Sequence, residues 1–226
     1  MKKWLLLVVT AVVLIGCTSS NSEQGERIQP VQLEEGDATN IPDWLFDSFR
    51  QKFSQPDEIK KESITLVYLR MDRKNRAPEI AAFLTTSHME GWFVLYAEEN
   101  GAYREVYAKG EPVYGLQVHG AVDHMISFVS GLGGSGVQKN NYHLIKYTKQ
   151  GYKEVWNGVA YDVLANGPPP LHKKFGTFFI DEHTGTLYYK QTAYNYNEDF
   201  EHVSSTKETS QVYHYDEEKD VFIPSS

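Results

Sequence analysis

Short runs of hydrophobic and polar residues alternate along most of the chain after Ser63. The run Tyr103–Tyr107 alternates with the period of two that a half-exposed β-strand requires. The run Trp92–Tyr96 is almost wholly apolar, which indicates a strand buried on both faces. Asn-Gly pairs, which supply the positive φ of tight turns, stand at 100–101, 157–158 and 166–167. The pattern predicts an all-β fold built from antiparallel hairpins.

Two of the predicted hairpins resemble each other in sequence. Val94–Tyr107 carries an apolar strand, a polar turn and Tyr-Arg-Glu-Val-Tyr, and Leu144–Trp156 repeats this order with Tyr-Lys-Glu-Val-Trp. Further hairpins are expected over 177–188 and, in a degenerate form, over 211–223. The offset of about 50 residues is typical of propeller blades, but the repeats are too few for a closed propeller of four or more blades. A propeller-like, incompletely repeated sheet assembly and a β-sandwich both fit.

One short N-terminal helix is expected before the strands, from about Pro42 to Phe53. Pro and Asp open it in the first turn, and an amphipathic face includes Trp44, Leu45 and Phe49. Short isolated helices are marginal in water, so we expect this one to dock on the β domain. The alternative is an aromatic stripe that contacts a membrane or a partner.

The segment Arg70–Ile80, with the Tyr-rich hairpin that follows it, resembles an FG-GAP or VCBS-type repeat. The resemblance covers about residues 64–158 and implies propeller-type blades, often with an Asp-rich calcium loop. Here the loop offers Asp72, Asn75 and Glu79 among four basic residues. Calcium takes six to eight oxygen ligands, so we expect none to bind at this loop.

The first residues have a different pattern. Lys2 and Lys3 precede an apolar run, Trp4–Ile15, that is too short to cross a bilayer and is typical of a signal peptide. Leu14-Ile15-Gly16-Cys17 resembles a bacterial lipobox of the Gram-positive type. The resemblance implies that Cys17 carries S-diacylglycerol and N-palmitoyl groups and holds the protein on the extracytoplasmic face of the cell membrane. An ordinary secretory signal with an incidental cysteine is the alternative.

Three regions follow from this interpretation: a lipoprotein signal peptide over 1–16, a lipidated cysteine and flexible spacer over 17–40, and a single β-rich domain over 41–226. Removal of the signal peptide changes the formal charge from −8 to −10, because Lys2 and Lys3 are lost. Such an acidic chain is a poor partner for nucleic acid. Cys17 is the only cysteine, so no internal disulfide can form.

Two motifs suggest chemistry only weakly. Gly131–Gly136 matches G-x-G-x-x-G, but strand-like residues follow it where a phosphate site needs a helix N-terminus, so we expect an inter-strand loop. His119, Asp123 and His124 are weak candidates for metal ligands. We expect no metal, no other cofactor and no enzymatic activity, since no reaction-specific motif is present.

The tract from Tyr188 to Phe200 contains Tyr188-Tyr189, Tyr194, Tyr196 and Phe200 beside several carboxylates. Exposed rings of this kind could stack on sugars, but alternating tyrosines are equally typical of a half-buried sheet, and we favour this structural interpretation.

The sequence therefore favours a lipid-anchored extracytoplasmic binding module. Its expected partners are the membrane, through the anchor, and an envelope protein or a wall glycan. A metal-dependent envelope hydrolase using His119, Asp123 and His124 is one alternative. A structural envelope component that self-associates through a sheet edge is another.

Overall fold

The computed structural model describes residues 41–72, 74, 77–120, 124–167, 170–198 and 200–225. The predicted signal peptide, Cys17 and the spacer lie outside these residues. The described part is all-β with one α-helix, as predicted. No helix among the described residues has the length and apolarity needed to cross a membrane.

Among the described residues, twelve strands form two antiparallel sheets, and within each sheet consecutive strands of the chain lie side by side. The first sheet contains β1 (Thr65–Leu69), β2 (Glu79–Thr85), β3 (Gly91–Glu99) and β4 (Ala102–Lys109). The second contains β5 (Val113–His119), β6 (Met125–Gly134), β7 (Val137–Thr148), β8 (Gly151–Leu164), β9 (His172–Asp181), β10 (Thr186–Tyr196), β11 (Val203–Asp216) and β12 (Val221–Pro224).

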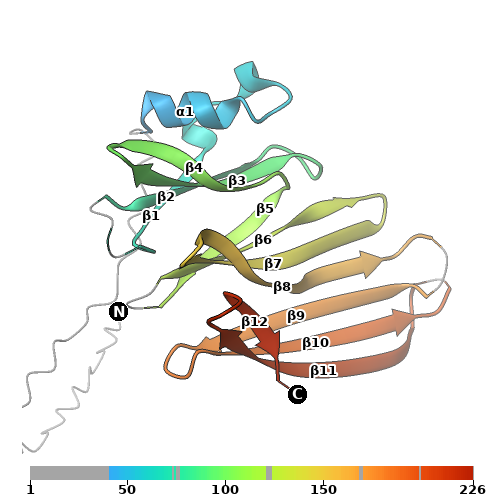
Figure 1. Cartoon of the computed structure of the whole chain (residues 1–226). Helices are drawn as coiled ribbons and strands as arrows, with labels where there is room; N and C mark the ends of the chain where they lie inside the picture. Colours follow the sequence, from blue (N-terminus) through green and yellow to red (C-terminus); the bar gives the residue numbers. More distant parts are fainter. Residues whose placement is uncertain are drawn as a thin grey trace, which may run out of the picture.

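The second sheet folds back on itself at its centre. β8 pairs with β9 only where Tyr161–Leu164 lies opposite His172–Phe175, so the rest of the two strands diverges. As a result β5–β8 and β9–β12 face each other as two four-stranded layers. Figure 1 shows the order of the whole stack: α1 (Asp43–Arg50), β1–β4, β5–β8 and β9–β12. Faces pack as in a β-sandwich, but the stack has three layers and a helix at one end.

A separate hydrophobic core fills each gap in the stack. Buried residues between α1 and β1–β4 include Leu45, Phe49, Ile80 and Val94. The gap between β1–β4 and β5–β8 holds Phe93 and Phe128 at its centre, with ring centroids 4.1 Å apart. The gap between β5–β8 and β9–β12 contains Met125, Leu144, Val155, Trp156, Ile180, Leu187 and Phe222.

The helix is shorter than its sequence pattern predicts. It runs from Asp43 to Arg50, with Pro42 as the N-cap residue, whereas the pattern predicted Pro42–Phe53. The predicted docking is confirmed, because Leu45 and Phe49 are fully buried against β1–β4. Trp44 stays 40% exposed, but its ring stacks on Tyr103 of β4 with centroids 5.2 Å apart.

The sequence repeat corresponds to a repeat in the structure. β3–β4 and β7–β8 are the last hairpins of the first two layers, and each contains a β-bulge. Glu105 and Tyr107 pair with consecutive residues of β3, which leaves Val106 as the extra residue. Val155 is the extra residue of β8 in the same way. A bulge turns two successive side chains toward one face, so Val155 and Trp156 both enter the third core.

One predicted turn is wrong. Asn157-Gly158 lies inside β8 and not between strands. A Cβ atom on Gly158 would lie 2.6 Å from the Trp156 ring, so this glycine leaves room for the indole of the repeated motif. Asn100-Gly101 does form the predicted turn, with φ values of 57° and 82°.

The segment that resembles a calcium loop connects β1 to β2, and its contacts centre on Glu79. This side chain is 1% exposed and accepts hydrogen bonds from the backbone N–H of Met71 (2.9 Å) and of Asp72 (3.1 Å). The hydroxyl of Tyr152 in the next layer donates a third, at 2.6 Å. Glu79 therefore closes the loop and joins it to β8. Asn75 lies outside the described residues.

Candidate functional site

The two described histidines among the weak metal-ligand candidates, His119 and His124, contact different layers. His119 Nε2 lies 2.7 Å from the Ser127 hydroxyl, and its ring lies 5.5 Å from that of Phe178 in the last layer. Burial lowers the pKa of His119, although the nearby Glu182 carboxylate opposes the shift. His124 instead accepts a hydrogen bond at 3.3 Å from the backbone N–H of Arg70, after β1.

The described chain therefore does not gather this group around one point. Asp123 lies outside the described residues. Within the ranges that the structure describes, no cluster of three His, Cys, Asp or Glu side chains has a metal-binding arrangement.

The glycine-rich motif lies mostly within a strand and not in the predicted loop. Gly131–Gly134 ends β6, and only Ser135 and Gly136 form the turn, both with positive φ. A Cβ atom on Gly131 would lie 1.9 Å from the Lys139 carbonyl oxygen of β7, so close strand approach requires glycine there. The next element is β7, so no helix N-terminus follows the motif.

A partly buried polar cluster that the sequence did not predict joins the first two layers. Glu154 of β8 accepts hydrogen bonds from the Tyr107 hydroxyl at 2.9 Å and from the Asn157 amide at 2.9 Å, and it lies 3.0 Å from His143 Nδ1. Burial alone would raise the pKa of Glu154, but the hydrogen bonds from His143, Asn157 and Tyr107 outweigh it and lower that pKa to about 2. Its members bind one another, so we assign the cluster a structural role.

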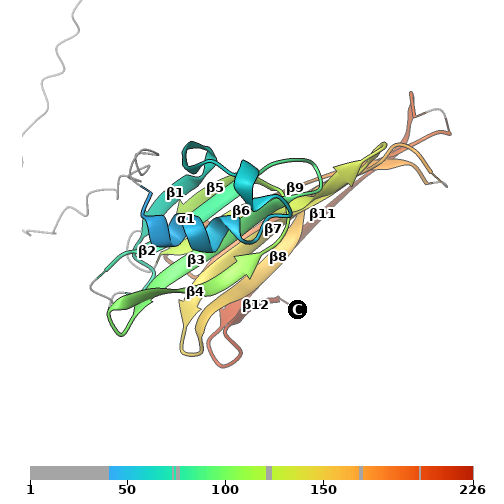
Figure 2. The same cartoon turned by 90° about the horizontal axis from the view of Figure 1, so that it is seen from above.

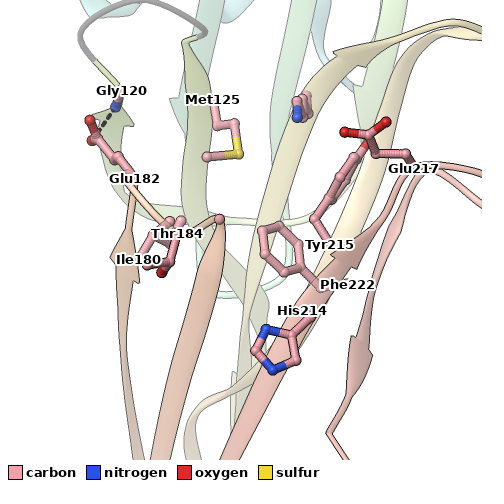
Figure 3. Close-up of a pocket in the computed structure, with 11 residues that line it drawn as sticks. Gly120, Met125, Ile180, Glu182, Thr184, His214, Tyr215, Glu217 and Phe222 are labelled. Atoms are coloured by element: carbon pink, nitrogen blue, oxygen red, sulfur yellow. Dashed lines mark hydrogen bonds between the residues drawn. The ribbon is translucent and has the colours of Figure 1, made fainter.

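A pocket of about 410 Å³ opens between the second and third layers, at the end where the β9–β10 and β11–β12 turns lie. Figure 3 shows Met125, Ile180 and Phe222 around it, from β6, β9 and β12. Glu182 stands at one side, where it accepts a hydrogen bond at 2.5 Å from the Gly120 backbone N–H. Glu217 stands at the other side, near Tyr215. The site thus combines an apolar floor with carboxylates at its mouth.

The outer face of the β9–β12 layer carries the most conspicuous exposed feature. No described element lies beyond this face in the stack (Figure 1). Phe179 of β9 and Tyr188 of β10 are paired in register, with 65% and 46% of their surfaces exposed. Their ring centroids are 6.4 Å apart. Ile223 of β12 is exposed on the same layer.

The rings continue along β9 and β10, joined by Tyr161 of β8 and by Phe200 of the turn after β10. Phe175, which is 45% exposed, lies 5.1 Å from Tyr161 and 6.2 Å from Tyr194 between ring centroids. Farther along, the ring centroids of Tyr196 and Phe200 are 4.4 Å apart, and the Lys173 Nζ atom lies 4.9 Å from the centroid of the Phe200 ring. We call this row the aromatic strip; its members are Phe179, Tyr188, Phe175, Tyr161, Tyr194, Tyr196 and Phe200.

The aromatic strip spans much of the outer layer. Tyr188 and Tyr196 are eight residues apart on one strand, which corresponds to roughly 27 Å. Figure 2 shows that the far ends of β9 and β11 belong to a long arm that extends beyond α1 and the first sheet. Between the rings stand Thr177, Lys190 and Thr192, and Lys190 forms an ion pair with Glu208 at 3.0 Å.

The sequence analysis found only part of the strip. Tyr188, Tyr194, Tyr196 and Phe200 belong to it, but Tyr189 points inward and donates a hydrogen bond at 2.9 Å to the Val159 carbonyl. Phe175 and Phe179 were missed, although their spacing of four with Thr177 between them is a period-two signal.

Comparison with protein-family models, with curated proteins and with solved structures finds no match to this chain.

Proposed function

We propose that this chain is a lipid-anchored extracytoplasmic protein whose β domain binds an envelope polysaccharide through the aromatic strip. The observation that supports this most strongly is the outer face of β9–β12, where the exposed rings of Phe175, Phe179 and Tyr188 continue into a row of half-buried rings. At the other end of the stack α1 packs on the first sheet, so that face is covered whereas the outer face of β9–β12 is open.

The composition of the strip favours a glycan over a protein partner. A protein interface usually has a contiguous apolar centre, whereas here threonine and lysine side chains separate the pairs of rings. A sugar ring has an apolar face of C–H groups and a rim of hydroxyls. Rings such as Phe179 and Tyr188 can stack on the face while Thr177 and Lys190 bond the rim. A row of roughly 27 Å would contact several units of one polymer.

Charged side chains of both signs lie along the strip. Lys173 and Lys190 are on β9 and β10, Glu208 is paired with Lys190, and Glu198 and Glu201 stand beside Phe200. Charged groups of both signs can exchange hydrogen bonds with the hydroxyl groups of a polysaccharide.

The predicted anchor and spacer complete the proposal. Two acyl chains on Cys17 would hold the protein at the membrane. A spacer over 17–40 would allow the β domain to reach the wall polymer above it.

Binding to purified wall polysaccharide tests this function. We expect full-length protein to co-sediment with the polymer, and the double change Phe179→Ala and Tyr188→Ala to weaken retention roughly fivefold or more. Both side chains are exposed, so the fold should be unaffected. Tyr114→Ala removes a ring on β5 that is 42% exposed and serves as the matched control. Equal retention of the double variant and wild type would refute the proposal.

The two alternative functions receive less support. A metal-dependent hydrolase needs converging ligands, and His119 and His124 bind partners in different layers. Self-association has a candidate edge, since β12 covers only Tyr213–Asp216 of β11 among the described residues. Lys207 and Glu208 lie on that free edge, and charged edge residues oppose indiscriminate strand pairing.

A further inference from the structure

The pocket between the second and third layers has walls that suit one chemical class of ligand. Its floor consists of Met125, Ile180 and Phe222, each less than 10% exposed. Phe222 meets Tyr215 edge to face, with centroids 5.3 Å apart and ring planes at 67°. An aromatic corner of this kind offers ring faces to a cation or to an apolar group.

The Tyr215 ring already contacts an ammonium group, that of Lys146. The Lys146 Nζ atom of β7 lies 3.9 Å from the centroid of the Tyr215 ring, across the gap between the layers. A cation and an aromatic face attract each other, and the attraction grows as water is excluded. The lysine of the chain itself therefore occupies part of the pocket as an ammonium ligand would.

Carboxylates are frequent in the turns near the mouth, and two of them, Glu182 and Glu217, line the pocket. The β9–β10 and β11–β12 turns together carry six carboxylates and one lysine, Lys219; the acidic residues are Asp181, Glu182, Asp216, Glu217, Glu218 and Asp220. Glu217 is exposed and has no hydrogen bond or ion pair with another described residue. Clefts lined by one sign of charge concentrate counter-ions at their mouths.

Lysines gather on the far side of the Lys146–Tyr215 pair. A second pocket of about 560 Å³ shares Lys146, Tyr215 and Glu217 with the first, and Lys74 and Lys149 line it as well. The first pocket is lined by one lysine and two glutamates, whereas the second is lined by three lysines and two carboxylates, so the first is the more negative of the two.

We propose that the first pocket binds a small organic cation: an ammonium group attached to an apolar or aromatic body. The body lies on Met125, Ile180 and Phe222, and the ammonium faces Glu182 and Glu217. The volume of about 410 Å³ is near the lower end of ligand pockets, so the cation is small. This site lies on the inner side of the last layer, and the inference does not depend on polysaccharide binding.

Three probes with the same ring but different charge test the proposal. They are 2-phenylethylammonium, 2-phenylethanol and 3-phenylpropionate, and ligand-observed NMR titrations measure their binding to the full-length protein in a neutral detergent. We expect the cation to bind most tightly and the anion most weakly. Glu217→Gln should weaken cation binding roughly two- to fivefold, since it removes one exposed carboxylate.

Lys146→Met gives a test of opposite sign. This change removes the resident ammonium and frees the Tyr215 ring, so the cation should bind roughly two- to fivefold more tightly. Glu218→Gln changes a carboxylate on the same turn that does not line the pocket, so it should weaken cation binding less than Glu217→Gln does. Tightest binding by the anion, weaker cation binding in the Lys146 variant, or no binding of any probe would each overturn the proposal. Tighter binding of the zwitterion phenylalanine than of 2-phenylethylammonium would also overturn it.

Discussion

The carboxylate of Glu154 illustrates how single residues hold the layers together. It lies in the gap between β1–β4 and β5–β8, where the Tyr107 hydroxyl reaches it from the preceding layer. Burial and the adjacent carboxylate raise the pKa of Tyr107, so this hydroxyl remains a donor at every physiological pH. The Glu154 side chain is 26% exposed, and its donors bind the ionised carboxylate better than the protonated form, so the stabilisation depends on ionisation.

The dependence of stability on pH follows from the lowered pKa of Glu154. Its value falls from 4.5 in the unfolded chain to about 2, so the carboxylate contributes at most about 3 kcal/mol. That contribution is complete above pH 4.5 and is lost as the pH falls toward 2. We expect Glu154→Gln to lower the free energy of unfolding at pH 6, and the deficit to be clearly smaller at pH 3. Urea unfolding at both pH values measures it.

Glu208→Gln is the control for this experiment. Glu208 forms an ion pair with Lys190 at the surface, with 58% of its side chain exposed, so its loss should cost less than about 1 kcal/mol. A deficit for the Glu154 variant that stays constant from pH 6 to pH 3 would contradict the account.

At the scale of single residues, the sequence pattern predicted which residues lie in strands but not which side chains are buried or what they contact. Period-two alternation separates two faces but does not say which one is exposed, so the sequence did not distinguish the inward Tyr189 from the outward Tyr188. The burial of Glu79 was not predictable, because its partner Tyr152 lies 73 positions later in the chain. Glu154 likewise depends on Tyr107, 47 positions earlier.

The elements themselves were largely predictable, because their signals are local. The hairpin repeat is visible in sequence and reappears as equivalent bulges at Val106 and Val155. The turn predicted at Asn157-Gly158 failed because tertiary packing overrode the local signal: the glycine accommodates the Trp156 ring inside β8. The helix end at Arg50 was also missed, since the apolar Phe53 continues the pattern past the last helical turn.

Docking explains why an eight-residue helix is stable here. Helices of this length are marginal alone, and α1 depends on Leu45 and Phe49 against the first sheet. We expect Phe49→Ala to lower the free energy of unfolding by about 3–5 kcal/mol, because it removes a fully buried ring and leaves a cavity. Chemical denaturation in urea measures the loss.

Trp44→Ala is the comparison on the same helix. Trp44 stacks on Tyr103 but remains 40% exposed, so its removal should cost at most about 1.5 kcal/mol. Equal small losses in the two variants would show that docking contributes little.

At the scale of the whole molecule, the layers form a stack with unlike ends. Each interior face is covered by the next layer, and α1 covers the first face (Figure 1). The last face has no described element against it and carries the aromatic strip. The sequence did not predict this asymmetry, because the stacking order depends on the fold at β8–β9, where only four residues of each strand pair.

Photocross-linking in intact cells tests most directly whether the outer face is the binding surface. The full-length protein would carry the photoreactive residue p-benzoylphenylalanine in place of Phe179, and in a matched control in place of Tyr114 on β5. We predict adducts from position 179 that contain wall polysaccharide, identified by mass spectrometry, and few from position 114. Adducts from position 114 alone, or only protein adducts from position 179, would contradict the account.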